Sequence, residues 1–145
     1  MRRSCTGYFI FLNIAPIVWF SKRQPKVETS VFSAEFVEMK NGMEALRGLW
    51  YTLRMRGVPL SGPSFSYEDN MSVIHNTQRP ASVLKKKYNS ICYHTCRESI
   101  AMDEMLTGHD RSENNLADLA TKVLGEGTKR NCLISHLLHD LTEYV

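Results

Sequence analysis

The stretch Ser30-Val31-Phe32-Ser33-Ala34-Glu35-Phe36 opens the longest amphipathic segment of the sequence. From Phe36 onward, apolar residues recur three or four positions apart, which is the spacing of a helix that buries one face. They are Phe36, Met39, Met43, Leu46, Trp50 and Leu53. The pattern predicts a helix with Glu35 in its first turn and its end near Gly57. Because the helix dipole favours an acid there, Glu35 by itself is interpreted as a solvated carboxylate.

The composition is that of an ordinary globular protein of one domain. The chain has 145 residues, of which 43% are hydrophobic and 23% are charged, so it contains enough apolar mass for one core. Its net charge of +3 permits contact with nucleic acid but does not by itself indicate it. Basic residues fall in separate groups, which either line a phosphate-facing surface or are solvated faces. They are Arg2-Arg3, Lys22-Arg23 with Lys26, Arg54 with Arg56, and Lys85-Lys86-Lys87.

The first twenty residues have two interpretations. Arg2-Arg3 and the apolar run 7–20 imitate a signal peptide or membrane anchor, but the run is shorter than the roughly 20 apolar residues of a membrane span. The run is also rich in aromatic and β-branched residues, which favours strands at 8–12 and 17–20 with a turn at 13–16. We therefore predict a hairpin, with the membrane anchor as the poorer alternative.

The middle of the chain predicts a strand that is followed by an acid. Residues 64–68 have the composition of a short strand, Asp69 follows it, and a helix is expected over 71–76. An acid at the carboxyl end of a strand lies where α/β folds place their chemistry. The alternative is that Asp69 only caps the helix.

The rest of the chain predicts three further helices and a strand. The expected elements are a helix over 84–102, a brief strand over 105–108, a helix over 116–123, and a helix from 130 that carries Leu133, Leu137, Leu138 and Leu141. Asn115 is the expected cap of the helix over 116–123, which places Asp118 near its first turn. We predict a domain over 1–124 and a helical tail over 125–145.

The cysteines are interpreted as reduced thiols. They are Cys5, Cys92, Cys96 and Cys132, and their spacing is not that of a zinc site. On a helix, Cys92 and Cys96 share a face while His94 points roughly the opposite way, so one metal cannot collect all three. A second group of cysteine and histidine lies at 132–139, and a structural zinc is the minor interpretation of both groups.

A series of short motifs runs along almost the whole chain. In order, they are Arg2-Arg3-Ser4 with Thr6-Gly7-Tyr8, Pro16-Ile17-Val18-Trp19 with Ser21-Lys22-Arg23-Gln24, Ala34-Glu35-Phe36, Asp69-Asn70 with Ser72, Tyr93-His94 with Arg97-Glu98, and Ala117-Asp118 with Thr121-Lys122. Their order and spacing resemble the ribonuclease H (RNase H) region at the C-terminal end of copia-like retrotransposon Pol polyproteins. Each motif is weak alone, and the resemblance rests on their sequence along the chain.

The resemblance implies an α/β, RNase H-like fold, in which helices flank a mixed five-stranded sheet. It also implies hydrolysis of the RNA strand of an RNA–DNA hybrid with two Mg²⁺ ions held by acidic side chains. Carried over by motif, Glu35, Asp69 and Asp118 are the catalytic and metal-binding acids. The implied partners are the hybrid and the reverse transcriptase domain of the same polyprotein, without a membrane. The implied location is the cytoplasm, in a virus-like particle, or the nucleus.

The sequence departs from this family at its start. The family's first catalytic aspartate lies on the central strand of the sheet, just before the Arg-Arg-Ser segment, whereas here Met1 directly precedes Arg2. The resemblance therefore implies a truncated domain that lacks this strand and one metal ligand, and that is inactive as it stands. The alternative is a non-catalytic module of RNase H-like shape that binds nucleic acid or another protein.

Overall fold

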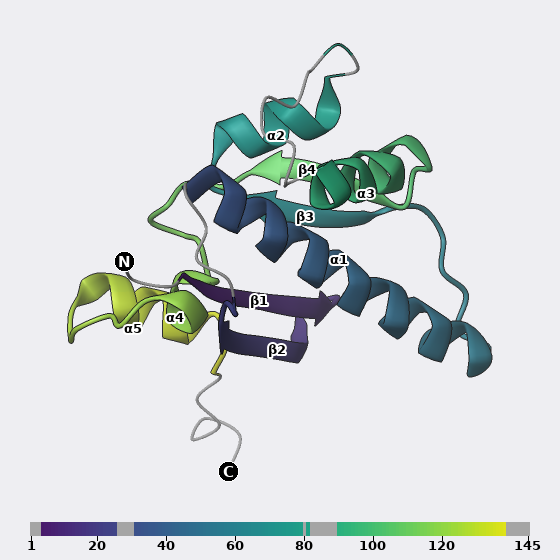
Figure 1. Ribbon diagram of the computed structural model, residues 1–145. Coiled ribbons are helices and arrows are strands. Elements are labelled where there is room, and N and C mark those ends of the chain that lie inside the picture. The colour runs from purple at the N-terminus through teal and green to yellow at the C-terminus, as the bar shows by residue number, and fades with distance from the viewer. Residues whose placement is uncertain (1–3, 26–30, 80, 82–89, 139–145) are drawn as a thin grey trace.

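A computed structural model describes residues 4–25, 31–79, 81 and 90–138 (Figure 1). In chain order, its elements are β1 (Cys5–Leu12), β2 (Ala15–Arg23), α1 (Val31–Met55), β3 (Ser64–Glu68), α2 (Met71–Gln78), α3 (Ser90–Ala101), β4 (Met105–His109), α4 (Asp118–Thr121) and α5 (Thr128–Ser135). The basic groups at 2–3 and 85–87, and the first part of the helix expected over 84–102, lie outside the described residues. So do His139 and Leu141.

The hairpin predicted near the N-terminus is confirmed. β1 and β2 pair antiparallel, with Phe9 opposite Trp19, and the turn between them contains Asn13 at a φ of 56°. Asparagine tolerates this left-handed conformation better than most residues, because its short side chain can bond locally. These residues form strands and not the apolar helix that the alternative of a membrane anchor requires. Among the residues that the structure describes, no helix is long and apolar enough to span a membrane.

A second sheet is formed by β3 and β4, which pair in parallel with Ser64 opposite Met105. In the described part of the chain, no strand joins this sheet to the hairpin, so the protein contains two separate two-stranded sheets. The α/β class is therefore confirmed. The RNase H-like arrangement with a missing central strand stays a prediction, with which two separate sheets are compatible.

Helix α1 lies between the two sheets and contacts both (Figure 1). Gly42 faces the ring of Tyr8 on β1, and the Trp50 Nε1 donates a hydrogen bond of 3.2 Å to the Ser64 Oγ on β3. The helix ends at Met55, close to the predicted Gly57, which has a φ of 74°. The expectation that Glu35 lies in the first turn is wrong, because the helix already begins at Val31.

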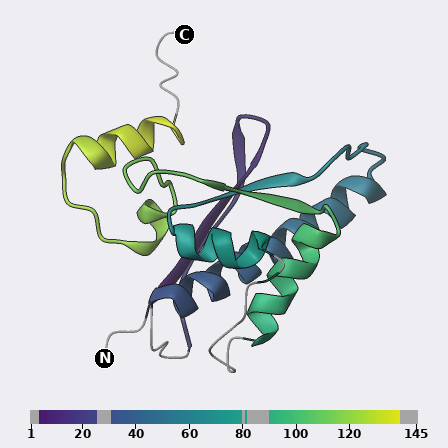
Figure 2. The ribbon, with the colours of Figure 1, turned by 90° about the horizontal axis from the view of Figure 1, so that it is seen from above.

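The core is built on the apolar face of α1 that the sequence predicted. Its buried members are Phe36, Met39, Met43, Val73, Tyr93, Cys96 and Met105. They come from α1, α2, α3 and β4, and Figure 2 shows these helices gathered beside β3 and β4. The apolar stripe of α1 therefore holds the second sheet and its helices together.

An ion pair fastens α1 to the connection between α3 and β4. The Arg47 Nη2 lies 2.7 Å from the Glu104 Oε2, and the Ser99 Oγ donates a 2.7 Å hydrogen bond to the same oxygen. The bonds from Ser99 and Arg47 lower the pKa of Glu104 below its usual value. This contact therefore requires an ionised Glu104.

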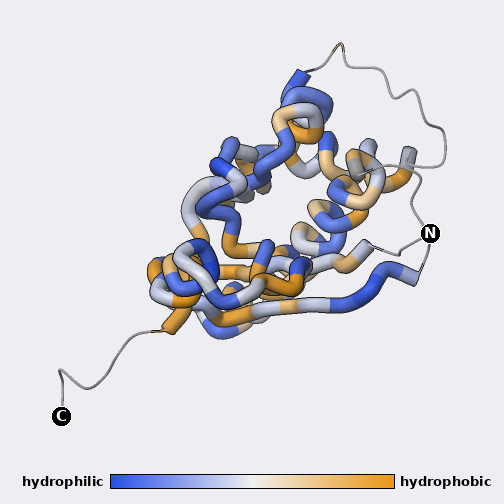
Figure 3. Tube along the Cα trace, turned by 90° about the vertical axis from the view of Figure 1, so that its left-hand side faces the viewer, coloured by the Kyte–Doolittle hydropathy of each residue, from blue (hydrophilic) through white to orange (hydrophobic). Residues whose placement is uncertain are grey.

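The C-terminal helices pack against the hairpin. The Ser21 Oγ donates a hydrogen bond of 2.5 Å to the Ala120 carbonyl oxygen, and a Cβ added at Gly7 would lie only 2.6 Å from the Ala120 Cβ. Glycine at position 7 thus permits the close approach of α4. Leu133 on α5 is fully buried. Figure 3 shows hydrophobic stretches, in orange, gathered where the hairpin and the C-terminal segment meet.

Two of the expected C-terminal helices are shorter than the sequence predicted. α4 spans four residues instead of 116–123, because the chain is already extended at Lys122. α5 starts earlier than expected and ends at Ser135, so Leu137 and Leu138 lie beyond it. Apolar spacing alone therefore overestimated both helices.

Candidate functional site

Glu35 lies on α1, beside the start of α2. The Asn70 Nδ2 donates a short hydrogen bond to the Glu35 Oε2, while the Asn70 Oδ1 accepts one of 2.8 Å from the Ser72 backbone N–H. Asn70 therefore caps α2 and fixes the Glu35 side chain at the same time. Burial raises the pKa of Glu35, the bond from Asn70 opposes this rise, and the negative charge of Asp69 adds to it.

Asp69 lies directly after β3, as predicted. The alternative that it serves only as the helix cap is wrong, because Asn70 is the N-cap of α2. The Asp69 Oδ2 instead accepts a hydrogen bond of 3.2 Å from the Ser112 Oγ, in the loop that follows β4. Asp69 thus lies at the carboxyl end of the parallel sheet and contacts the neighbouring loop.

Asp118 is the first residue of α4 and is only 2% exposed. Two ammonium groups bind its carboxylate: the Lys122 Nζ lies 2.6 Å from Oδ1, and the Lys129 Nζ lies 2.6 Å from Oδ2. Burial alone would raise the pKa of Asp118, but the hydrogen bonds from the two lysines lower it overall. The Asn115 Oδ1 accepts a 3.0 Å hydrogen bond from the Ala117 N–H, which stabilises the turn before α4.

Two further acids belong to this site and were not among the predicted site residues. The Glu38 Oε1 accepts a 2.9 Å hydrogen bond from the Gly7 N–H on β1, and burial raises the pKa of Glu38 to about 7. Burial, followed by repulsion from Glu38, Glu35 and Asp69, raises the pKa of Glu68 to about 8. The sequence positions of both acids could have indicated that they lie near the predicted site residues. Glu38 lies three residues after Glu35 on one helical face, and Glu68 directly precedes Asp69.

These five residues, Glu35, Glu38, Glu68, Asp69 and Asp118, form what we call the acid cluster. Glu38 interacts electrostatically with Glu35, Asp69 and Asp118 together, although these three acids come from α1, the end of β3 and α4. The expected convergence of the three acids is therefore present in the structure. Their roles in catalysis and metal binding stay predictions.

The acid cluster has the right chemistry for Mg²⁺ but not the right arrangement. Carboxylate oxygens are the ligands that this hard cation prefers. Within the described ranges, however, no group of three or more histidine, cysteine or acidic side chains is placed to hold a metal ion. Both oxygens of Asp118 are bound by lysines, and Glu35 and Asp69 accept hydrogen bonds from Asn70 and Ser112. In this conformation the residues do not fit a pair of Mg²⁺ ions.

The cysteine and histidine residues on α3 do not form a second site. Cys96 is fully buried in the core, where burial raises the pKa of its thiol to about 12. His94 is exposed and contacts the edge of the Tyr93 ring. All four cysteines are free thiols.

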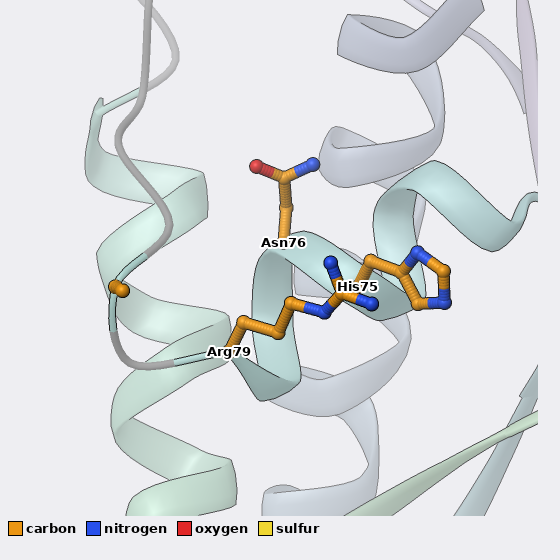
Figure 4. Close-up of a pocket in the computed structure, with 4 residues that line it drawn as sticks. His75, Asn76 and Arg79 are labelled. Carbon is orange, nitrogen blue, oxygen red and sulfur yellow. The ribbon is translucent and has the colours of Figure 1, made fainter.

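A separate hollow of about 300 Å³ lies at the C-terminal end of α2 (Figure 4). His75, Asn76, Arg79 and Ala81 line it. It contains none of the residues of the acid cluster, which lies at the other end of α2. Arg79 supplies a permanently charged guanidinium to this described lining.

Sequence comparison identifies relatives among transposon proteins. Over 128 residues, the chain is 29% identical to a retrovirus-related Pol polyprotein from transposon RE2 of Arabidopsis thaliana and 28% identical to one from transposon RE1 of the same plant. Each alignment covers 88% of this chain but only 9% of the polyprotein. No protein-family model matches the sequence, and no solved structure matches it significantly. The resemblance to copia-like retrotransposon Pol polyproteins is thus confirmed.

Proposed function

We propose that this chain, which is similar to a segment of retrotransposon Pol polyproteins, is the RNase H region of such a polyprotein. In its complete form, this region would cut the RNA strand of an RNA–DNA hybrid. The observation that carries the proposal is the convergence of Glu35, Asp69 and Asp118 from three separate elements. Structural ion pairs explain the surroundings of Asp118 but not why Asp69 lies close enough to Glu35 to help raise the pKa of Glu35.

The separation of the two sheets supports a missing strand between them. Among the residues that the structure describes, β1 pairs with β2 alone, and the Gly7 N–H on β1 donates to the side chain of Glu38 instead of to another strand. In the proposed domain, an upstream strand carrying the fourth acid pairs with β1 and β3. It also adds a carboxylate to the acid cluster.

In the proposed complete domain, Glu35, Asp69, Asp118 and the upstream aspartate would hold Mg²⁺, in a conformation that differs from the present one, in which they do not fit a pair of ions. The bound ions would activate water and stabilise the charge that develops at the scissile phosphate. The side chains of this chain would contribute fixed oxygen atoms: Glu35 from the rigid helix α1, Asp69 from the end of β3, and Asp118 once its lysine partners have been displaced.

A cleavage assay with three proteins tests the proposal. They are the 145-residue chain, the chain extended upstream by the aspartate-bearing strand, and the extended chain with Asp69→Asn, which keeps the shape but removes a negative charge. We expect Mg²⁺-dependent cleavage of the RNA strand by the extended chain only. Each ~1.4 kcal/mol of lost transition-state stabilisation lowers the rate about tenfold, so loss of one metal-binding acid is expected to abolish detectable cleavage.

Two results of this assay would contradict the proposal. Robust cleavage by the 145-residue chain would remove the need for an upstream acid. Undiminished activity after Asp69→Asn would show that Asp69 is not one of the acids that support cleavage.

The alternative function is a non-catalytic module that binds nucleic acid or another protein. It is favoured by the two lysines on Asp118 and by the hollow around Arg79, which together offer positive charge but no metal site. In the same assay, this alternative predicts that the extended chain binds the hybrid and leaves it intact.

The similarity to Pol polyproteins also supports a proposal for the partners and the cellular location of the chain. The proposed partners are the RNA–DNA hybrid and the reverse transcriptase domain of the same polyprotein. The proposed location is the cytoplasm, in a virus-like particle, or the nucleus.

A further inference from the structure

The backbone groups of β3 alternate between the two edges of that strand. β3 pairs in parallel with β4, and the Ser64 N–H at its start donates a 3.0 Å hydrogen bond to the Glu104 carbonyl oxygen just before β4. Along a strand, the N–H and C=O of successive residues point to opposite edges, so every second residue of β3 bonds to β4. Phe65 and Tyr67 are the residues between, and their N–H and C=O groups therefore point away from β4.

The outer edge of β4 is bonded, whereas the outer edge of β3 is open. The Gln78 Nε2 on α2 donates hydrogen bonds of 2.8 Å to the Thr107 carbonyl oxygen and of 2.9 Å to its Oγ1. In the part of the chain that the structure describes, no hydrogen bond reaches the N–H or C=O of Phe65 or Tyr67, which we call the open edge of β3. A row of unpaired backbone groups on a strand is a template for pairing with a further strand.

The residues of the open edge also expose their aromatic rings. Phe65 is 68% and Tyr67 is 64% exposed, and Leu106, which lies opposite Phe65, is 40% exposed. Met105, the preceding residue of β4, is buried in the core, so these three side chains lie on the face of the sheet that points away from the core. A strand added at the open edge would place every second side chain beside the two rings, at the spacing of a cross-strand pair.

We propose that the open edge of β3 binds an extended segment of another polypeptide chain by strand addition. The backbone of Phe65 and Tyr67 supplies the donors and acceptors, and the two rings favour apolar side chains at alternate positions of the segment. A third strand also stabilises the sheet, because a sheet of two strands is marginal by itself. The inference goes beyond the proposed function, since it concerns the chain without an upstream strand and needs neither a cation nor cleavage.

The test is an NMR titration of the 145-residue chain with a synthetic peptide that alternates valine with serine and has capped ends. We expect hydrogen exchange of the Phe65 and Tyr67 amides to become at least roughly tenfold slower when the peptide is bound. The Ser66 amide serves as the internal control and should change much less, because it already faces β4. The control peptide has the same side chains but a methyl group on every backbone nitrogen, so it cannot donate to the open edge and should protect neither amide.

A pair of variants tests the contribution of the rings. Tyr67→Ser is expected to lower the affinity for the peptide by roughly two- to fivefold, because it removes one cross-strand contact and leaves the backbone in place. Tyr51→Ser removes a ring of similar exposure, 69%, from α1 and should leave the affinity unchanged.

The proposal is overturned if roughly millimolar peptide protects neither Phe65 nor Tyr67, or if the methylated peptide protects them equally. It is also overturned if the chain without peptide self-associates and protects both amides, because the occupant would then be a second copy of the chain. The readout needs no hybrid and no metal, so failure of strand addition appears in this titration and failure of the proposed ribonuclease function in the cleavage assay.

Discussion

Phe36→Ala is expected to destabilise the protein by about 3–5 kcal/mol, the range measured when a buried aromatic side chain is removed. Phe36 is fully buried on α1, and its ring centroid lies 4.9 Å from that of Phe32 and 5.8 Å from that of Tyr93 on α3. This loss would be a large share of the free energy of unfolding of a typical domain, which is roughly 5–15 kcal/mol. Urea denaturation followed by circular dichroism measures it.

Phe65→Ala provides the control for this experiment. Phe65 lies on β3, but its side chain is 68% exposed, so its removal is expected to change the free energy of unfolding by less than about 1 kcal/mol. Similar losses in the two variants would show that the core is not centred on α1. Such a result would also mean that burial of the apolar face of α1 is not what fixes the position of Glu35.

The second large effect concerns pH. We expect the folded protein to lose stability as the pH rises from about 5 to about 8. Burial and repulsion raise the pKa of Glu68 from 4.5 to about 8 and that of Glu38 to about 7, so in this range the folded state holds more protons than the unfolded state. The free energy of unfolding must then fall with increasing pH.

At more acidic pH the free energy of unfolding instead rises with increasing pH, because the lowered pKa values of Glu104 and Asp118 favour their ionised forms in the folded state.

Thermal unfolding of Glu68→Gln at several pH values measures this effect. Glutamine keeps the shape of the protonated acid, so the stability of the variant should fall much less between pH 5 and pH 8. The variant should melt at least about 3 °C above the parent at pH 8. Glu113→Gln removes an exposed acid and serves as the control for net charge. A parent protein whose melting temperature stays constant between pH 5 and pH 8 would contradict the raised pKa values.

The elements that the sequence predicted best are those with a strong local signal. The hairpin followed from an aromatic and β-branched run with a turn residue at Asn13, and the core face of α1 followed from its apolar spacing. The strand before Asp69 was found in the same way. Each of these predictions rests on local composition or spacing, so it did not depend on contacts between distant residues.

The parts that the sequence did not reveal depend on tertiary contacts. Burial in the tertiary structure raises the pKa of Glu38, a hydrogen bond from Gly7 on another element opposes this rise, and repulsion from the surrounding acids adds to it. Lys129 binds Asp118 across eleven positions in the chain, a spacing that no helix or strand pattern predicts. The first residue of α1 was also not predicted, because the residues before Phe36 show no regular spacing of apolar side chains that would mark where the helix begins.

The central claim is that acids of this chain support cleavage of RNA. It is tested most directly by the single-turnover rate at which the extended chain, in Mg²⁺, cuts the RNA strand of a hybrid after Glu35→Gln or Glu44→Gln. Both acids lie on α1, but Glu44 is exposed and forms an ion pair with Lys40 away from the acid cluster. We expect a rate at least roughly hundredfold lower for Glu35→Gln, which corresponds to about 2.7 kcal/mol of lost transition-state stabilisation, and an unchanged rate for Glu44→Gln. Equal rates for the two variants would contradict it.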